Sequence, residues 1–121
     1  MSQVFAAAGT HVLADLSGVA GELLTNPAAF DALLREAALA AGATILHSHF
    51  HSFGSGQGVT GVVLLAESHI SIHTWPEAGF AAADIFMCGD CDPLAALAVL
   101  RERLRPGACA VRTVQRREQN N

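Results

Sequence analysis

The chain has 121 residues, a length that fits one domain, and 51% of its residues are hydrophobic, which is enough for a packed core. Only 15% are charged and the net charge is -4, so the composition argues against a disordered chain and against a nucleic-acid partner. All seven basic residues are arginine, which excludes an internal aldimine between a lysine and pyridoxal phosphate. No basic leader and no apolar run of membrane-spanning length is seen, so we expect one cytoplasmic domain over residues 1–121, with no membrane partner.

The pattern of apolar residues predicts six strands and two helices. Runs rich in β-branched and apolar residues predict strands at about 10–16, 44–52, 59–66, 68–74, 80–87 and 109–114. An N-cap residue followed by proline opens one helix at Asn26-Pro27, which ends near Gly42, and another at Asp92-Pro93, which ends near Pro106-Gly107. This order predicts an α+β fold, a two-layer sandwich of a mainly antiparallel sheet with two helices on one face. The other face needs a cover, and we expect the chain to dimerise through the sheets.

The expected strand at 44–52 contains three alternating histidines, His47, His49 and His51, whose side chains point to one side of an extended strand. Three imidazoles on one face could form a metal-binding module, although the glutamate of a cupin-like ligand set is missing. A histidine-rich strand near an active site or interface is the alternative, and we assign no metal. The glycine-rich segment 54–58 is not followed by a helix, as a phosphate-binding loop requires, so we expect a hairpin loop.

Two of the three cysteines, Cys88 and Cys91, have the spacing of a redox motif or of half a zinc site. A strand ends at Cys88 and a helix opens just past Cys91, which is partly the context of a redox motif. No second cysteine pair completes a structural zinc site, and Asp92 is explained as a helix cap. The odd number of cysteines fits a reducing compartment better than a disulfide framework.

The segment ESHISIHTWPE, residues 67–77, concentrates polar side chains on a short strand. Alternation puts the polar and the apolar side chains on opposite faces, with His69, Ser71 and His73 on one and Ile70 and Ile72 on the other. This pattern is typical of an edge strand with a solvated face. It is also compatible with a nucleophile and a base, because Ser68 follows a carboxylate and precedes His73 by five residues. Neither spacing decides between the two interpretations.

The run AESHISIHTWPE, with AAADIFMCGD after it and GVTGVV before it, resembles the small bacterial S-adenosylmethionine decarboxylases. The likeness extends over nearly the whole chain, from HVLAD at residue 11 to the final strand. The resemblance implies a self-processing, pyruvoyl-dependent carboxy-lyase. This enzyme would convert S-adenosylmethionine to the aminopropyl donor of spermidine biosynthesis and would assemble as a homodimer of αβ protomers.

The resemblance also implies how the cofactor is made. The precursor would cut itself between Glu67 and Ser68, giving a β chain of residues 1–67 and an α chain of residues 68–121. Ser68 Oγ would attack the Glu67 carbonyl to give an ester, and elimination followed by hydrolysis would leave a pyruvoyl group at position 68. That group, the only cofactor expected, would form a Schiff base with the substrate.

Five further residues receive roles from the same resemblance. His73 would accept the proton during processing with help from Thr60, and Cys88 would donate the proton to the product. Phe53 would stack on adenine and Glu77 would bind the ribose hydroxyls. Two features depart from many relatives: Thr60 stands where they have serine, and the segment 53–59 is one residue longer.

Three other interpretations remain. A related pyruvoyl decarboxylase could act on another amino acid, arginine or ornithine, with Phe53 and Glu77 as the discriminating positions. A metal-binding module could be built on the three histidines of 44–52. A binding protein with an inactive Ser68 would remain uncut.

Overall fold

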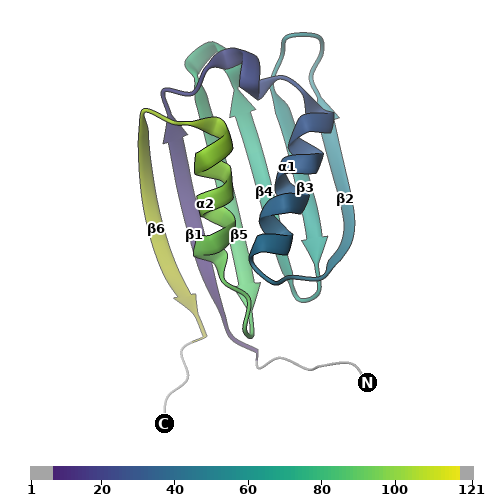
Figure 1. Cartoon of the computed structure of the whole chain (residues 1–121), viewed down its shortest axis with the longest axis vertical. Coiled ribbons are helices and arrows are strands. Elements are labelled where there is room, and N and C mark those ends of the chain that lie inside the picture. The colour runs from purple at the N-terminus through teal and green to yellow at the C-terminus, as the bar shows by residue number, and fades with distance from the viewer. Residues whose placement is uncertain (1–6, 118–121) are drawn as a thin grey trace.

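Six antiparallel strands form one sheet in this computed structural model, which describes residues 7–117. The spatial order is β2-β3-β4-β5-β1-β6, and every neighbouring pair is antiparallel. The strands are β1 (Gly9–Ser17), β2 (Ile45–Ser52), β3 (Val59–Leu65), β4 (Ser68–Trp75), β5 (Phe80–Cys88) and β6 (Ala108–Arg116). Helices α1 (Pro27–Ala40) and α2 (Pro93–Leu104) lie side by side on one face (Figure 1). The predicted α+β two-layer arrangement is confirmed, and each strand lies within two residues of its predicted bounds.

Both helices begin at the predicted caps. The Asn26 side chain accepts hydrogen bonds from the backbone N–H groups of Ala28 and Ala29, and Asp92 accepts one from Leu94. Two short 3-10 helices, η1 (Gly21–Leu24) and η2 (Pro76–Ala78), were not predicted. They are too short to leave a periodic signal in the sequence. None of the helices in residues 7–117 has the length and apolar character needed to span a membrane.

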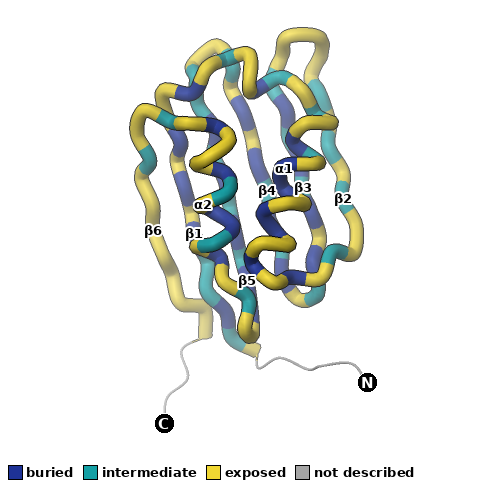
Figure 2. Tube along the Cα trace, in the orientation of Figure 1, coloured by how far each residue is buried: buried dark blue, intermediate teal, exposed yellow. Residues whose placement is uncertain are grey.

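The hydrophobic core lies between the sheet and the two helices. Strands β1, β3, β4 and β5 alternate buried and more exposed residues, which is visible as alternating bands in Figure 2. Their buried side chains meet Phe30 and Leu34 of α1 and Leu100 of α2, all at most 1% exposed. Strand β6, in contrast, is exposed at nearly every residue and forms one edge of the sheet.

Strand β2 forms the opposite edge and is tied to the core by side-chain contacts. Phe50 lies over Gly61 of β3, where a Cβ atom would come within 1.9 Å of the phenyl ring, so glycine is required there. Ser48 donates to Asp31 of α1, and Arg35 donates to both Asp31 and Ser48. These contacts fix the face that β2 turns toward the helices.

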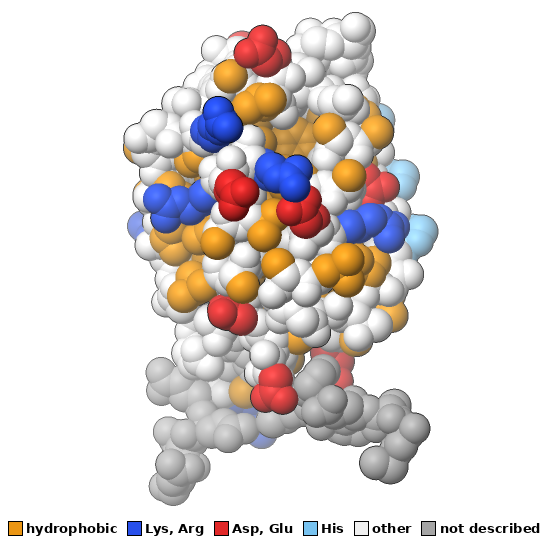
Figure 3. Space-filling view, viewed as in Figure 1, with side chains coloured by type: hydrophobic (Ala, Val, Ile, Leu, Met, Phe, Trp, Pro, Cys, Tyr) orange, Lys and Arg blue, Asp and Glu red, His pale blue; other side chains and the backbone are white. Residues whose placement is uncertain are grey.

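The sheet face away from the helices is called the open face below. Strand register places all six histidines of the chain on this face: His11, His47, His49, His51, His69 and His73. Large apolar side chains accompany them, including Leu13, Leu64 and Trp75, which are 38%, 45% and 43% exposed. On the helix face, Arg, Asp and Glu side chains lie among apolar ones (Figure 3). The open face is the sheet face through which the sequence predicts that two chains dimerise.

Candidate active site

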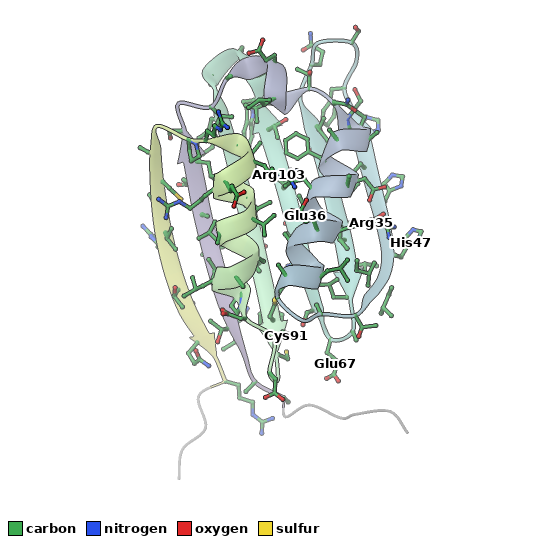
Figure 4. The ribbon with its side chains drawn as sticks, in the orientation of Figure 1. Arg35, Glu36, His47, Glu67, Cys91 and Arg103 are labelled. Atoms are coloured by element: carbon green, nitrogen blue, oxygen red, sulfur yellow. The ribbon has the colours of Figure 1, made fainter. Side chains whose placement is uncertain are left out.

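A two-residue turn joins β3 to β4 at one end of the sheet. Leu65 and Ser68 pair with each other, so Ala66 and Glu67 form the turn. Glu67 has a φ of 58°, in the left-handed region that a residue with a Cβ atom rarely occupies. The peptide bond after this strained residue is the predicted cleavage bond, Glu67–Ser68, and Figure 4 shows Glu67 at the lower end of the molecule.

Cys88, at the end of β5, contacts both sides of that bond. Its backbone N–H donates to Ser68 Oγ at 3.2 Å, and its Sγ donates to the Glu67 carbonyl oxygen at 3.1 Å. Ser68 is only 9% exposed and Cys88 7%. We call Glu67, Ser68 and Cys88 the cleavage end of the molecule. The structure thus brings together three of the predicted site residues.

The two neighbouring thiols are held in their protonated form. Burial raises the pKa of Cys88, and the negative charge of Glu67 raises it further. Burial also raises the pKa of Cys91, followed by the charge of Asp90, and the Cys91 thiol donates to the Gly42 carbonyl at 3.6 Å. A redox cysteine needs an accessible thiolate, so this environment favours proton donation by Cys88 over redox chemistry.

A pocket of about 320 Å³ lies at the other end of the β3–β4 hairpin. The Thr60 hydroxyl lies 3.1 Å from His73 Nδ1 on the adjacent strand. The pocket contains all four remaining predicted site residues, and its full lining is Phe53, Gln57, Gly58, Thr60, His73, Thr74, Trp75 and Glu77. We call this region the pocket end.

Two residues without a predicted site role shape the pocket end. Trp75 lies on the same face of β4 as His73, with ring centroids 6.4 Å apart, and also packs 5.5 Å from the Phe80 ring. The buried Thr74 hydroxyl donates to the Leu24 carbonyl at 2.7 Å and accepts from the Val59 N–H at 2.8 Å. Alternation from His73 is the sequence signal that places Trp75 on the same face of the strand.

Ser68 and His73 do not meet within one chain. They are five residues apart on β4, a separation of about 16 Å along an extended strand. Ser68 is buried with Ile70 and Ile72, whereas His73 is exposed on the open face. The interpretation of the two residues as a nucleophile and base within one strand is therefore wrong for a single chain.

The three histidines of β2 point to the open face, as predicted, but do not converge. In the described residues their ligand atoms do not form a group of three within 4.8 Å of one another. Within residues 7–117, the one group of three metal-ligating side chains close enough to share an ion lies elsewhere, on β1, β4 and β5.

Comparisons with known proteins agree with the motif-based resemblance. A family model described as S-adenosylmethionine decarboxylase matches residues 10–117. An S-adenosylmethionine decarboxylase proenzyme of Caldicellulosiruptor saccharolyticus is 43% identical over 91% of this chain and 89% of its own length. A proenzyme of Clostridium kluyveri is 49% identical over 68% of this chain and 64% of its own length, just under two thirds of that protein. The crystal structure of the adenosylmethionine decarboxylase from Aquifex aeolicus has a TM-score of 0.80 and 36% identity, and the match covers 99% of this chain and 100% of that one.

Proposed function

The chain belongs to the S-adenosylmethionine decarboxylase family, and we propose that it cuts itself between Glu67 and Ser68 and then decarboxylates S-adenosylmethionine. Its predicted family and enzyme class are confirmed by the family model and the proenzyme relatives, which do not favour the arginine, ornithine or metal-module alternatives. Conversion of the Ser68 residue into a pyruvoyl group, the residue roles and the homodimer are part of the proposal. The observation that carries it is the contact of Cys88 with both sides of the Glu67–Ser68 bond.

The cleavage end supplies what an attack by Ser68 Oγ needs. The Cys88 N–H fixes the hydroxyl oxygen, and the Cys88 thiol donates to the carbonyl oxygen on which negative charge develops. The left-handed conformation of Glu67 costs about 1–3 kcal/mol, a strain that is released when the peptide bond breaks. These features raise the energy of the intact turn and stabilise the charge that forms during attack.

The proposed processing steps balance without an added oxidant. Ser68 Oγ bonds to the Glu67 carbonyl carbon, the peptide C–N bond breaks, and the hydroxyl proton moves to the Ser68 nitrogen. A base then removes the Ser68 α-proton, and the Oγ–Cβ bond breaks to release Glu67 as a carboxylate. Water replaces the nitrogen of the remaining dehydroalanine, ammonia leaves, and position 68 becomes a pyruvoyl group.

The base is His73 of a second protomer. His73 of the same chain is about 16 Å from Ser68, so it cannot serve. In the proposed dimer the two open faces stack, and the twofold axis runs parallel to the sheets and perpendicular to β4. This axis reverses the direction of β4 in one protomer relative to the other. The pocket end of one protomer therefore lies over the cleavage end of its partner. Exposed Leu13, Leu64 and Trp75 on the open face supply apolar area for such packing. The dimer expected from the sequence then completes the site as well as covering the sheet.

The pocket end provides the substrate-binding groups. Its volume of about 320 Å³ falls at the lower end of the range for small-molecule pockets, and the second protomer extends it. Phe53 and Trp75 offer aromatic faces for adenine, and the Glu77 carboxylate accepts hydrogen bonds from the ribose hydroxyls. Thr60 holds the His73 ring through its Nδ1 atom.

Position 68 suits a small electrophilic group. Ser68 is nearly buried and has the Cys88 N–H as a donor, and the chain has no lysine that could condense with a ketone. The pyruvoyl ketone would condense with the substrate amine and draw electrons from it as carbon dioxide leaves. The Cys88 thiol, kept protonated by its raised pKa, then delivers a proton to the product.

Intact-mass measurement of the purified chain under denaturing conditions tests the proposal. We expect the full-length mass to give way to fragments of residues 1–67 and 68–121, the second with a blocked pyruvoyl terminus. Ser68→Ala should stay uncut and inactive while remaining folded. A wild-type chain that keeps its full-length mass after long incubation, or a Ser68→Ala chain that still decarboxylates S-adenosylmethionine, would contradict the proposal.

A further inference from the structure

We propose that His11, His69 and Asp84, here called the Asp84 site, bind a divalent transition-metal ion of the zinc class on the open face. One ring nitrogen of each histidine and one carboxylate oxygen of Asp84 all lie within 4.8 Å of one another. His11 Nε2 contacts Asp84 Oδ1, and His69 Nε2 lies 3.5 Å from Asp84 Oδ2. The site shares no residue with the cleavage end or the pocket end and does not depend on self-cleavage.

Strand register explains why these side chains converge. His11 of β1 and His69 of β4 both lie opposite Phe86 of β5, and Asp84 precedes Phe86 by two residues, so all four share the open face. The Phe86 ring packs against both imidazoles, with centroid distances of 5.6 and 6.0 Å. Three ligands on three directly paired strands form a rigid set, whereas His47, His49 and His51 lie along a single edge strand.

The donor set matches a transition metal. Zinc and other divalent first-row transition metals accept two imidazole nitrogens and one carboxylate oxygen as ligands. Three protein ligands leave a fourth coordination position for water. In the single chain the His11, His69 and Asp84 side chains are 18%, 35% and 35% exposed, so an ion can enter before two open faces stack in the proposed dimer. A simple ion pair would use one histidine, yet both rings present the same nitrogen to one carboxylate.

One neighbouring group must move when the metal binds. Arg116 Nη1 lies 3.5 Å from His11 Nδ1, and both atoms carry protons once His11 Nε2 is bound to a metal. Arg116 is exposed near the end of β6, so its side chain can turn into solvent. Removing the guanidinium in Arg116→Gln should therefore leave zinc affinity unchanged or strengthen it.

Titration of the metal-free chain with zinc chloride, followed by calorimetry, tests the Asp84 site. We expect one ion per chain with a dissociation constant on the order of micromolar, and a rise in melting temperature of about 5 °C at saturating zinc. Asp84→Asn and His69→Gln should each weaken binding at least about tenfold. His49→Gln, which removes an exposed imidazole of the same face, is the matched control and should bind as the wild type does. The same titration of the Ser68→Ala chain should give the same result, because the site is present before cleavage.

Three results would overturn the Asp84 site. Wild-type affinity in both Asp84→Asn and His69→Gln would show that these side chains do not hold the ion. Loss of binding in His49→Gln but not in Asp84→Asn would move the metal to the β2 histidines, and loss only in Cys91→Ala would move it to the thiols. Circular dichroism of each metal-free variant checks folding, and His11→Gln replaces any variant that does not fold. Failure of self-cleavage would leave these results unaffected, so the two proposals fail separately.

Discussion

The two ends of the β3–β4 hairpin differ in nearly every physical property, although one pair of strands builds both. The cleavage end is buried and has a strained residue in its turn. The Cys88 thiol there donates to the Glu67 carbonyl oxygen at 3.1 Å, and the Cys88 backbone N–H donates to Ser68 Oγ at 3.2 Å. The pocket end is more open and more aromatic, and it carries the imidazole of His73 and the carboxylate of Glu77. The first end is suited to breaking its own backbone, and the second to holding a ligand and moving a proton.

In the proposed dimer, this difference gives each end a group that the other end lacks. The cleavage end has a nucleophile and a donor to the Glu67 carbonyl oxygen, but that donor, the Cys88 thiol, has a raised pKa and stays protonated, so it cannot act as the base. The pocket end has an exposed base, His73, about 16 Å along the strand from Ser68 of the same chain. Stacking two open faces in opposite directions supplies each end with what it lacks.

Loss of the base should have the largest effect on activity. In His73→Ala, we expect self-cleavage to slow by at least about 100-fold, because a positioned base contributes roughly that much or more. Its stability should change by less than about 1 kcal/mol, since the side chain is exposed. His49→Ala removes a histidine from the same face and should cleave normally. Gel densitometry over time measures both, and equal rates for the two variants would remove His73 from the mechanism.

Loss of the thiol should separate cleavage from decarboxylation. Cys88→Ala should still cut itself, somewhat more slowly because the Glu67 carbonyl loses a donor, but should decarboxylate about 100-fold more slowly. Misplaced protonation should convert the group at position 68 to alanine, which intact mass detects. Cys91→Ala, a cysteine three residues away, should behave as the wild type. Equal damage from both variants would favour a joint redox role for the two thiols.

The rate of decarboxylation should fall at alkaline pH as the Cys88 thiol loses its proton. Because burial and the Glu67 charge raise the pKa of Cys88, the acid form persists above the usual range of a cysteine thiol. The alkaline limb of the kcat profile should therefore lie above the usual thiol range and be absent in Cys88→Ala. A limb at an ordinary thiol pKa would contradict the protonated-thiol assignment.

A smaller effect is expected from the residue that holds the base. Thr60→Val keeps the shape but removes the hydroxyl 3.1 Å from His73 Nδ1, and should slow self-cleavage by about tenfold. Thr60→Ser keeps the hydroxyl and should cleave at nearly the wild-type rate. If Thr60→Val cleaves itself at the wild-type rate, the contact between Thr60 and His73 does not contribute to self-cleavage.

The smallest effect is expected on the helix face, away from both ends. Arg103 of α2 donates to both carboxylate oxygens of Glu36 of α1, at 2.6 and 2.8 Å, and the two side chains meet between the helices in Figure 4. Both are about half exposed, so Glu36→Gln should lower the free energy of unfolding by no more than about 1 kcal/mol. Urea denaturation measures this change, and self-cleavage should be unaffected. A large loss of cleavage would show that the helix layer influences the open face.

Local signals made most of the fold predictable. The Asn26-Pro27 and Asp92-Pro93 caps marked both helices, and alternation within each run marked the strands, because these signals act between near neighbours in sequence. The motif-based resemblance named the candidate site residues but not their distribution between two ends. Alternation alone would have placed Ser68 and His73 on opposite faces, since they differ by an odd number of positions.

Long-range strand register was beyond the sequence patterns. The Asp84 site depends on β5 pairing with both β1 and β4, whose residues His11 and His69 are 58 positions apart in the sequence. The contact between Cys88 and Glu67 likewise depends on where β5 ends relative to the β3–β4 turn. No single-sequence pattern encodes either register.

Coexpression of two inactive variants tests the shared site most directly. Ser68→Ala chains keep the base but cannot cut, and His73→Ala chains keep the serine but lack the base. In a mixed dimer, one composite site has both Ser68 and His73, so we predict that the His73→Ala chain is cut when the Ser68→Ala chain is present and stays uncut without it. Intact mass distinguishes the two chains. If His73→Ala remains uncut in isolated mixed dimers, or cuts itself equally well alone, the account of two ends joined across a dimer is contradicted.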